Sequence, residues 1–297
     1  MLDPHPGLPE FEYVKPASLQ EASLFLAEHP TEARPFLGGT DCFVRMRDGF
    51  WNIRYMVDVK HLDGTGNLSF NPAQGLVIGA AVNMNQVAAY PAVKEVYPLL
   101  SEAAHTVASY QLRSRATIVG NICNASPAGD TTGPCIVLEG KLHVYNAGGE
   151  RVEPLRSFFL GPGKTVLKPG DIVTAISFPL PPKGSVGRYL KLGRNKIGDL
   201  AIVGVTALGY PDPAAASGYR FKLALASVAP VPLVPSQAEI LLAEKFINET
   251  TITEAAQLAM DTCTPIDDVR GGAKYRKYMV RNLVRQAVTE VWECIRS

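Results

Sequence analysis

Two glycine-containing segments, far apart in the sequence, carry the residue types that bind anions. Residues 36–41 read Phe-Leu-Gly-Gly-Thr-Asp and residues 116–121 read Ala-Thr-Ile-Val-Gly-Asn. Glycines allow backbone angles closed to other residues, and the exposed N–H groups, together with threonine hydroxyls, can donate to an anion. Two uncharged donor loops suit a pyrophosphate. With the residues that follow the second segment, the candidates are Phe36, Leu37, Gly38, Gly39, Thr40, Asp41, Thr117, Gly120, Asn121, Asn124 and Asp130.

Neither segment matches a standard nucleotide-binding fingerprint. The sequence contains no G-x-G-x-x-G and no G-x-x-x-x-G-K-[ST], and a glycine pair met in isolation is more often a tight turn. A carboxylate repels a phosphate, so Asp41 is expected to cap the helix behind the first turn through its side chain. The anion site and the plain turn both stay open on this pattern alone.

The elements that must position these residues follow from hydrophobic spacing. Ser18 and Glu21 form a capping box ahead of an apolar helix face, which predicts a helix at 18–28. Adjoining runs predict strand, helix, strand, helix, strand through residue 59. Next come a hairpin at 68–80, a helix capped by Asn83 and a helix at 99–107. Further strands are expected at 136–145, 152–155 and 171–178.

A proline-rich stretch at 179–184 marks the expected domain boundary, because prolines remove strand donors and hold the chain extended. Beyond it, strands are predicted at 189–192, 201–209 and 220–228, then helices from about Gln237, Thr253 and Ala273. Strands followed by helices indicate an α+β domain. The expected division is 1–180, with lobes of about 1–60 and 61–180, and then 185–297.

Composition excludes several classes of protein. Of the 297 residues, 46% are hydrophobic and 19% charged, which fits a folded chain, and the net charge of +1 argues against a nucleic-acid partner. The histidines are scattered, which gives no metal site, and no apolar run predicts membrane insertion. Five separated cysteines without C-x-x-C and without a signal-like start favour reduced thiols in the cytoplasm. Their spacing holds no iron–sulfur cluster in this chain.

The two segments together resemble a known family. The order and separation of L-G-G-T-D at 37–41 and R-x-R-A-T-I-x-G-N-I-C-N-A-S-P-A-G-D at 113–130 are similar to the FAD-binding medium subunit of the molybdenum hydroxylases, the xanthine dehydrogenase and carbon monoxide dehydrogenase group. The resemblance continues at Lys191, Arg194, 199–201 and 272–276. It implies a two-part FAD-binding domain of the vanillyl-alcohol-oxidase/PCMH type and a C-terminal three-stranded antiparallel sheet packed on helices.

The resemblance also implies roles for single residues. FAD would lie between the domains, with Asp130 approaching its ribityl chain or ribose and with Val173 and Lys191 near the isoalloxazine. A lysine near the N1–C2=O edge would raise the reduction potential, although Lys191 read without the family is a surface strand lysine. Arg194 and Asp199 are expected to pair with each other.

The implied function is that of the FAD-carrying electron-transfer subunit of a heterotrimeric molybdenum-containing dehydrogenase. Electrons would come from two [2Fe-2S] clusters of a small subunit and pass to NAD or another acceptor, while a large molybdenum-cofactor subunit hydroxylates the substrate with water. The assembly would be a dimer of heterotrimers.

Two alternatives stay open. A self-contained flavin oxidase of the vanillyl-alcohol-oxidase type would need a larger second domain than the chain offers after Pro182. A partner that has lost its cofactor is favoured only by Val119, which replaces the first glycine of the family's second pair. Valine would be strained there if the position required a positive φ.

Overall fold

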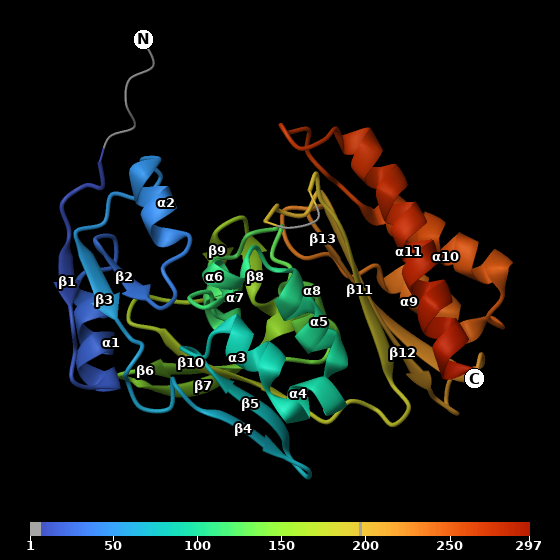
Figure 1. Cartoon of the computed structure of the whole chain (residues 1–297), viewed down its shortest axis with the longest axis horizontal. Helices are drawn as coiled ribbons and strands as arrows, with labels where there is room; N and C mark the ends of the chain where they lie inside the picture. The colour runs from blue at the N-terminus through green and yellow to red at the C-terminus, as the bar shows by residue number, and fades with distance from the viewer. Residues whose placement is uncertain (1–6, 196–197) are drawn as a thin grey trace.

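The structure, a computed structural model, describes residues 7–195 and 198–297 and is a mixed helix and strand arrangement (Figure 1). The first lobe holds a parallel three-stranded sheet in the order β1-β3-β2. Its expected alternation of strands and helices is confirmed. The elements are β1 (Glu12–Val14), α1 (Leu19–Glu28), β2 (Ala33–Phe36), α2 (Cys42–Arg47) and β3 (Tyr55–Asp58).

The start of α1 follows the predicted cap closely. The Ser18 hydroxyl accepts the N–H of Glu21 at 3.1 Å, and the Glu21 carboxylate accepts the N–H of Ala17 at 2.7 Å, one residue before the position of an ideal capping box. Ala22 and Leu26 are buried in the cluster that joins this helix to the sheet. The helix thereby fixes the end of β2, from which the first glycine segment leaves.

A buried carboxylate ties β3 to β1 in this lobe. Asp58, whose side chain is 1% exposed, accepts the Tyr13 hydroxyl at 2.6 Å and the Lys60 ammonium at 2.6 Å. Burial alone raises the pKa of Asp58, but the hydrogen bonds from Lys60 and Tyr13 outweigh it and lower that pKa to about 2. The ionised carboxylate therefore stabilises the fold.

We expect Asp58→Asn to lower the free energy of unfolding by about 2 kcal/mol at neutral pH. The folded pKa lies below the unfolded value of 3.8, so the stabilisation is present above about pH 4 and is lost as the pH falls toward about 2. Urea unfolding at neutral pH and near pH 3 measures this, and the difference between wild type and variant should fall by about half at the lower pH. Asp63→Asn, at an exposed position, is the control, and a difference independent of pH would contradict the assignment.

The second lobe holds a five-stranded antiparallel sheet in the order β4-β5-β10-β6-β7. Its strands are β4 (Leu68–Asn71), β5 (Gly75–Gly79), β6 (Lys141–Asn146), β7 (Gly149–Pro154) and β10 (Ile172–Phe178), with a small pair β8 (Phe159–Gly161) and β9 (Lys164–Thr165). The hairpin β4–β5 and the helix cap at Asn83 are confirmed, and Gln86 completes a capping box there. Helices cover one face of the sheet (Figure 1) and enclose the largest core cluster. The helical elements of this lobe are α3 (Met84–Ala89), α4 (Pro91–Val96), α5 (Pro98–Thr106), α6 (Tyr110–Arg113), α7 (Ile118–Cys123), α8 (Thr132–Val137) and the single turn η1 (Leu155–Ser157).

The prediction of one strand over 136–145 is wrong in its first half. Helix α8 runs to Val137, the chain turns through Glu139 at φ +59°, and the strand begins at Lys141. The short run Ile136-Val137-Leu138 is apolar on every side because it sits in the core. A buried run of this length cannot be assigned to helix or strand from periodicity.

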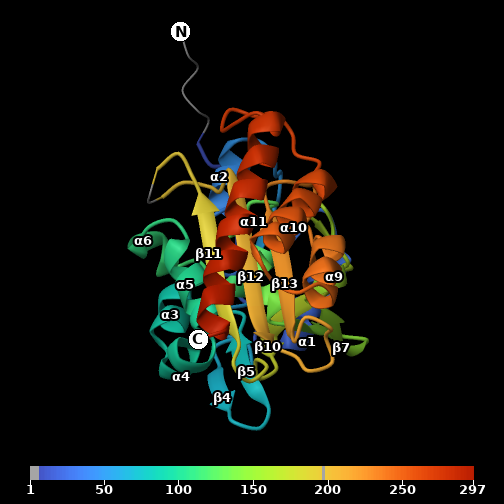
Figure 2. The ribbon, with the colours of Figure 1, turned by 90° about the vertical axis from the view of Figure 1, so that its right-hand side faces the viewer.

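The remaining chain forms a three-stranded antiparallel sheet in the order β11-β12-β13, with three helices on one face (Figure 2). The elements are β11 (Val186–Leu192), β12 (Val203–Pro211), β13 (Tyr219–Ala226), α9 (Ser236–Glu244), α10 (Glu249–Thr262) and α11 (Ala273–Ile295). Helix α10 begins four residues before the expected Thr253, because Asn248 caps it through the N–H of Thr251. Within the described residues, no helix combines the length and apolarity needed to cross a membrane.

Candidate functional site

A cavity of about 800 Å³ brings the two glycine segments together with residues 198–200, which lie between β11 and β12 of the C-terminal sheet. Its walls come from the first lobe, the second lobe and residues 198–200. Of the predicted site residues, those lining it are Leu37, Gly38, Gly39, Thr40, Asp41, Thr117, Gly120, Asn121, Asn124, Asp130 and Val173. Phe36 and Lys191 stand behind the lining residues. We call this cavity the cleft.

The first segment forms a turn that only glycine can complete. Gly39 has φ +73°, and a Cβ there would lie 2.4 Å from the Phe36 ring, which is buried beneath the turn. At Gly38 a Cβ would lie 2.2 Å from the Arg115 carbonyl oxygen. The first turn therefore rests directly on the backbone that leads into the second segment, and residues of both segments line the cleft.

The predicted cap at Asp41 is wrong. Asp41 occupies the position before α2, but its carboxylate makes no capping hydrogen bond and instead accepts the Thr40 hydroxyl at 3.4 Å. The physical reason is its backbone, which is already helical at φ −101° and ψ −27°. A capping side chain needs the extended backbone that Ser18 has.

The second segment is a helix start and not an open loop. The Thr117 hydroxyl accepts the N–H of Gly120 at 2.9 Å and caps α7. Val119 is helical and 1% exposed, packed in the core of the second lobe. The position needs no positive φ, so the valine is not strained there. The one feature that favoured a chain without its cofactor is thereby removed.

Two asparagines beyond this helix start face the cleft differently. The Asn121 side-chain oxygen accepts the Thr131 hydroxyl at 2.8 Å. The Asn124 side-chain oxygen is buried and finds no hydrogen-bond donor in the part of the chain that the structure describes. An orphaned buried acceptor is costly. At a cleft wall it fits a ligand that brings a hydroxyl donor, as a ribose or ribityl chain does.

Asp130 joins the cleft to the C-terminal sheet. Its carboxylate accepts the Tyr189 hydroxyl at 2.7 Å and the Lys191 ammonium at 2.7 Å, and that ammonium also donates to the Thr106 carbonyl at 3.2 Å. Burial raises the pKa of Asp130, and the nearby Lys191 and Tyr189 offset this only in part. Lys191, on β11, contacts the back of the cleft wall through Asp130.

Sequence reasoning missed Tyr189, although a signal for it exists. Side chains two apart on a strand share a face, and Tyr189 and Lys191 are two apart on β11. With Lys191 as a candidate site residue, Tyr189 on the same face of β11 is a candidate by the same reasoning. The buried tyrosine hydroxyl adds the second donor that the Asp130 carboxylate requires.

The cleft is also lined by charged side chains from outside the two glycine segments. Among the described residues, four carboxylates line it, and three of them are neutralised by ion-pair partners: Asp130 by Lys191, Asp171 by Arg151 and Asp199 by Arg194. Three lining cations, none in an ion pair with any described residue, are Arg34, Lys164 and Lys168. The uncompensated charge is therefore positive, which favours an anionic ligand.

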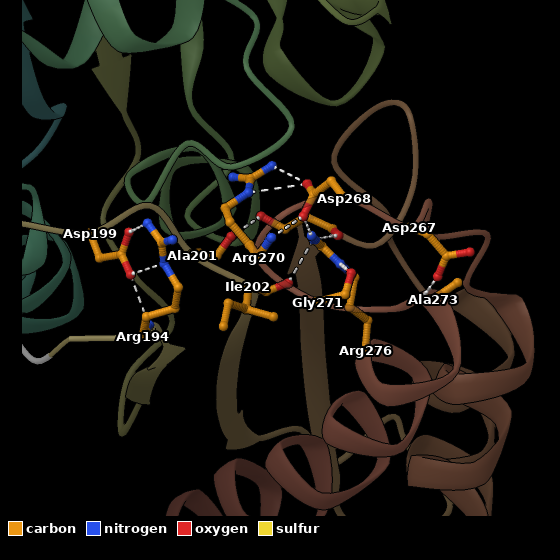
Figure 3. Close-up of polar contacts among 11 residues, drawn as sticks. Arg194, Asp199, Ala201, Ile202, Asp267, Asp268, Arg270, Gly271, Ala273 and Arg276 are labelled. Atoms are coloured by element: carbon orange, nitrogen blue, oxygen red, sulfur yellow. Dashed lines mark hydrogen bonds and ion pairs between the residues drawn. The ribbon is translucent and has the colours of Figure 1, made fainter.

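The C-terminal wall of the cleft is Gly198, Asp199 and Leu200. Arg194 donates to the Asp199 carboxylate from its backbone N–H at 2.8 Å and from Nε at 3.2 Å, which confirms the expected pairing (Figure 3). Leu200 is 55% exposed at the mouth of the cleft. The same figure shows Arg270 and Arg276 pointing toward Asp268. Sequence reasoning gave neither Leu200 nor Arg276 a role.

Comparison with known proteins agrees with this geometry. Residues 9–181 match the family model described as the FAD binding domain in molybdopterin dehydrogenase, and residues 188–291 match the CO dehydrogenase flavoprotein C-terminal domain. The chain is 30% identical to the carbon monoxide dehydrogenase medium chain of Hydrogenophaga pseudoflava over 96% of its own length and 98% of the relative's. It is 27% identical to a putative xanthine dehydrogenase FAD-binding subunit of Escherichia coli, over 94% of each chain.

The solved structures give the same result. Carbon monoxide dehydrogenase from Hydrogenophaga pseudoflava, in a form lacking the Mo-pyranopterin moiety of its cofactor, superimposes with a TM-score of 0.91 at 30% identity, covering 96% of this chain and 98% of that one. The cleft lies within the segments that these matches cover. The chain therefore belongs to the FAD-binding medium subunits of the molybdenum hydroxylase family and is the flavoprotein component of an oxidoreductase.

Proposed function

We propose that the chain is the FAD-carrying electron-transfer subunit of a heterotrimeric molybdenum hydroxylase. It takes electrons from the [2Fe-2S] clusters of a small subunit and delivers them to NAD or another acceptor. The observation that carries the proposal is the cleft, in which both glycine segments and the C-terminal wall meet around a volume of about 800 Å³. FAD, when bound, supplies a ring that can accept single electrons and release a pair.

The residues of the chain divide the work of holding the cofactor. Main-chain N–H groups of Leu37 to Asp41 and of the Thr117 helix start, with the three lining cations, would hold the pyrophosphate. Phe36 supports the first turn from below. The side-chain oxygens of Asn121, Asn124 and Asp130 would accept from sugar and ribityl hydroxyls.

The isoalloxazine would lie against the C-terminal wall, beside Val173. This valine is 6% exposed and offers an apolar contact. The Lys191 ammonium is held between Asp130 and Thr106. In the proposal Lys191 keeps the Asp130 carboxylate beside the cofactor compensated, so that no unpaired negative charge at this wall opposes the reduced, anionic flavin.

The domain plan supports the same reading. We infer an FAD-binding domain at 1–180 of the vanillyl-alcohol-oxidase/PCMH type, with lobes of about 1–60 and 61–180, and a C-terminal domain at 185–297. The parallel and the five-stranded sheets form separate lobes, and the family matches end and resume on either side of 182–187.

The partners follow from the kind of subunit. Relatives named medium chains support a small iron–sulfur subunit and a large molybdenum-cofactor subunit, and we propose a dimer of such heterotrimers in the cytoplasm. A self-contained flavin oxidase is less well supported, because the C-terminal part matches the CO dehydrogenase flavoprotein domain and not a separate substrate domain.

Anaerobic reduction of the three-subunit complex tests the electron route. With the clusters reduced photochemically, flavin absorbance is expected to bleach after the clusters' own signal changes, and NAD or a quinone is then expected to restore it. The complex assembled with the Gly38→Ala chain is the control, since it should hold reduced clusters without passing electrons on. Clusters that are reduced while bound flavin stays oxidised would contradict the proposed route.

A further inference from the structure

One residue contacts the backbone behind both sides of the cleft. Ser227 follows β13 and has φ +65°. Its N–H donates to the Pro127 carbonyl at 2.7 Å, and its hydroxyl donates to the Ala201 carbonyl at 2.8 Å. Pro127 lies between the lining residues Ser126 and Ala128, and Ala201 directly follows the lining residue Leu200. The two walls are therefore joined through Ser227.

Arg276, from the first turns of α11, holds this junction in place. Its side chain is fully buried and donates to the carbonyls of Ile202 and Ser227, each at 3.0 Å. It also donates to the Asp268 carboxylate at 2.6 Å (Figure 3). A guanidinium serves several acceptors at once because its donors form a rigid planar fork, whereas an ammonium cannot reach them all.

The Asp268 carboxylate, which pairs with Arg276, is also held by Arg270. Asp268 accepts from the backbone N–H, Nε and Nη2 of Arg270, the last at 2.6 Å. The hydrogen bonds from Arg270 hold the pKa of Asp268 well below its usual range. Asp268 therefore stays ionised across the working pH range and keeps the buried guanidinium compensated.

We propose that Arg276 and Ser227 are positioning residues for the cofactor cleft. Neither lines the cleft. They hold 200–202 in register with 126–128, so helix α11 sets the separation of the two walls and thereby the affinity and reduction potential of the bound flavin. The inference rests on the proposed function for its cofactor, although the register of the walls is a property of the chain alone.

Two variants disrupt the contacts between the cleft walls to different extents. Ser227→Ala removes only the hydroxyl bond to Ala201, and we expect about fivefold weaker FAD binding. Arg276→Lys keeps the charge but loses the fork, and we expect FAD binding to weaken at least about tenfold, in line with losses of supporting contacts around other cofactors. Arg285→Met, on an exposed face of the same helix, is the matched control and should behave as wild type.

The readouts are FAD affinity, the flavin reduction potential and amide hydrogen exchange of 198–205 in the cofactor-free chain. A merely structural role would lower global stability without shifting the potential or speeding exchange selectively in that segment. Ser227→Ala decides the case if Arg276→Lys does not fold. The inference is wrong if the Ser227→Ala chain has the same FAD affinity, flavin reduction potential and amide hydrogen exchange as the wild type. If the wild-type chain takes up no FAD, the proposed function fails, and exchange alone then supports or overturns the positioning of the walls.

Discussion

Gly38→Ala is expected to abolish FAD binding and to lower the free energy of unfolding by about 3 kcal/mol. The added Cβ would lie 2.2 Å from the Arg115 carbonyl oxygen and 2.8 Å from its carbon. Both atoms belong to the backbone, so no side chain can rotate away to make room. The first turn must separate from the chain that enters α7, so the N–H groups of the two segments could no longer bind one phosphate group as we propose. Urea unfolding and titration with FAD measure the two effects.

Gly66→Ala is the matched control for this change. Gly66 has no atom within 4 Å of an added Cβ, and its φ lies outside the left-handed region. We expect both its stability and its FAD affinity to stay close to wild type. A Gly38→Ala chain that bound FAD as tightly as the Gly66→Ala chain would show that the two segments do not act together.

Lys191→Met is expected to destabilise the fold by about 3–5 kcal/mol at neutral pH, because it strands the buried Asp130 carboxylate without its cation. Losing the cation raises the pKa of Asp130 further above its unfolded value. A folded pKa above the unfolded one gives stability that is present at low pH and is lost as the pH rises. The variant should therefore be less impaired near pH 5 than near pH 8. Urea unfolding of wild type and variant across this range measures the trend.

A double-mutant cycle measures the interaction energy between Lys191 and Asp130. Adding Asp130→Asn to Lys191→Met should recover part of the lost stability, because no unpaired charge then remains. Lys245→Met is the control, since Lys245 pairs with Glu254 at the surface at 2.8 Å and such pairs contribute about 1 kcal/mol or less. Equal losses for Lys191→Met and Lys245→Met, or additive effects in the cycle, would mean that Asp130 and Lys191 are not coupled.

Local sequence signals predicted much of this fold because the interactions behind them are local. Ser18 and Asn83 cap their helices through N–H groups three residues away. The hairpin β4–β5 is defined by its own turn. The proline-rich stretch precedes β11 as expected. The family order of motifs extended these local predictions to the location of the site.

The remaining features depend on contacts that sequence spacing does not encode. Gly38 lies against the Arg115 carbonyl although the two residues are 77 positions apart in the sequence. Arg276 lies near the start of a long helix. Arginine is usually exposed in folded proteins, yet this side chain is fully buried. Asp41 failed as a cap because the backbone around it, and not its residue type, decides whether a side chain can cap.

The most direct test of the central claim is the absorption spectrum of the purified chain, followed by acid release and chromatography of the cofactor. We expect visible flavin bands, FAD in the supernatant and uptake of added FAD by the stripped chain, all lost in Gly38→Ala and kept in Gly66→Ala. A colourless wild-type chain that takes up no FAD, even when produced together with its partner subunits, would contradict this expectation.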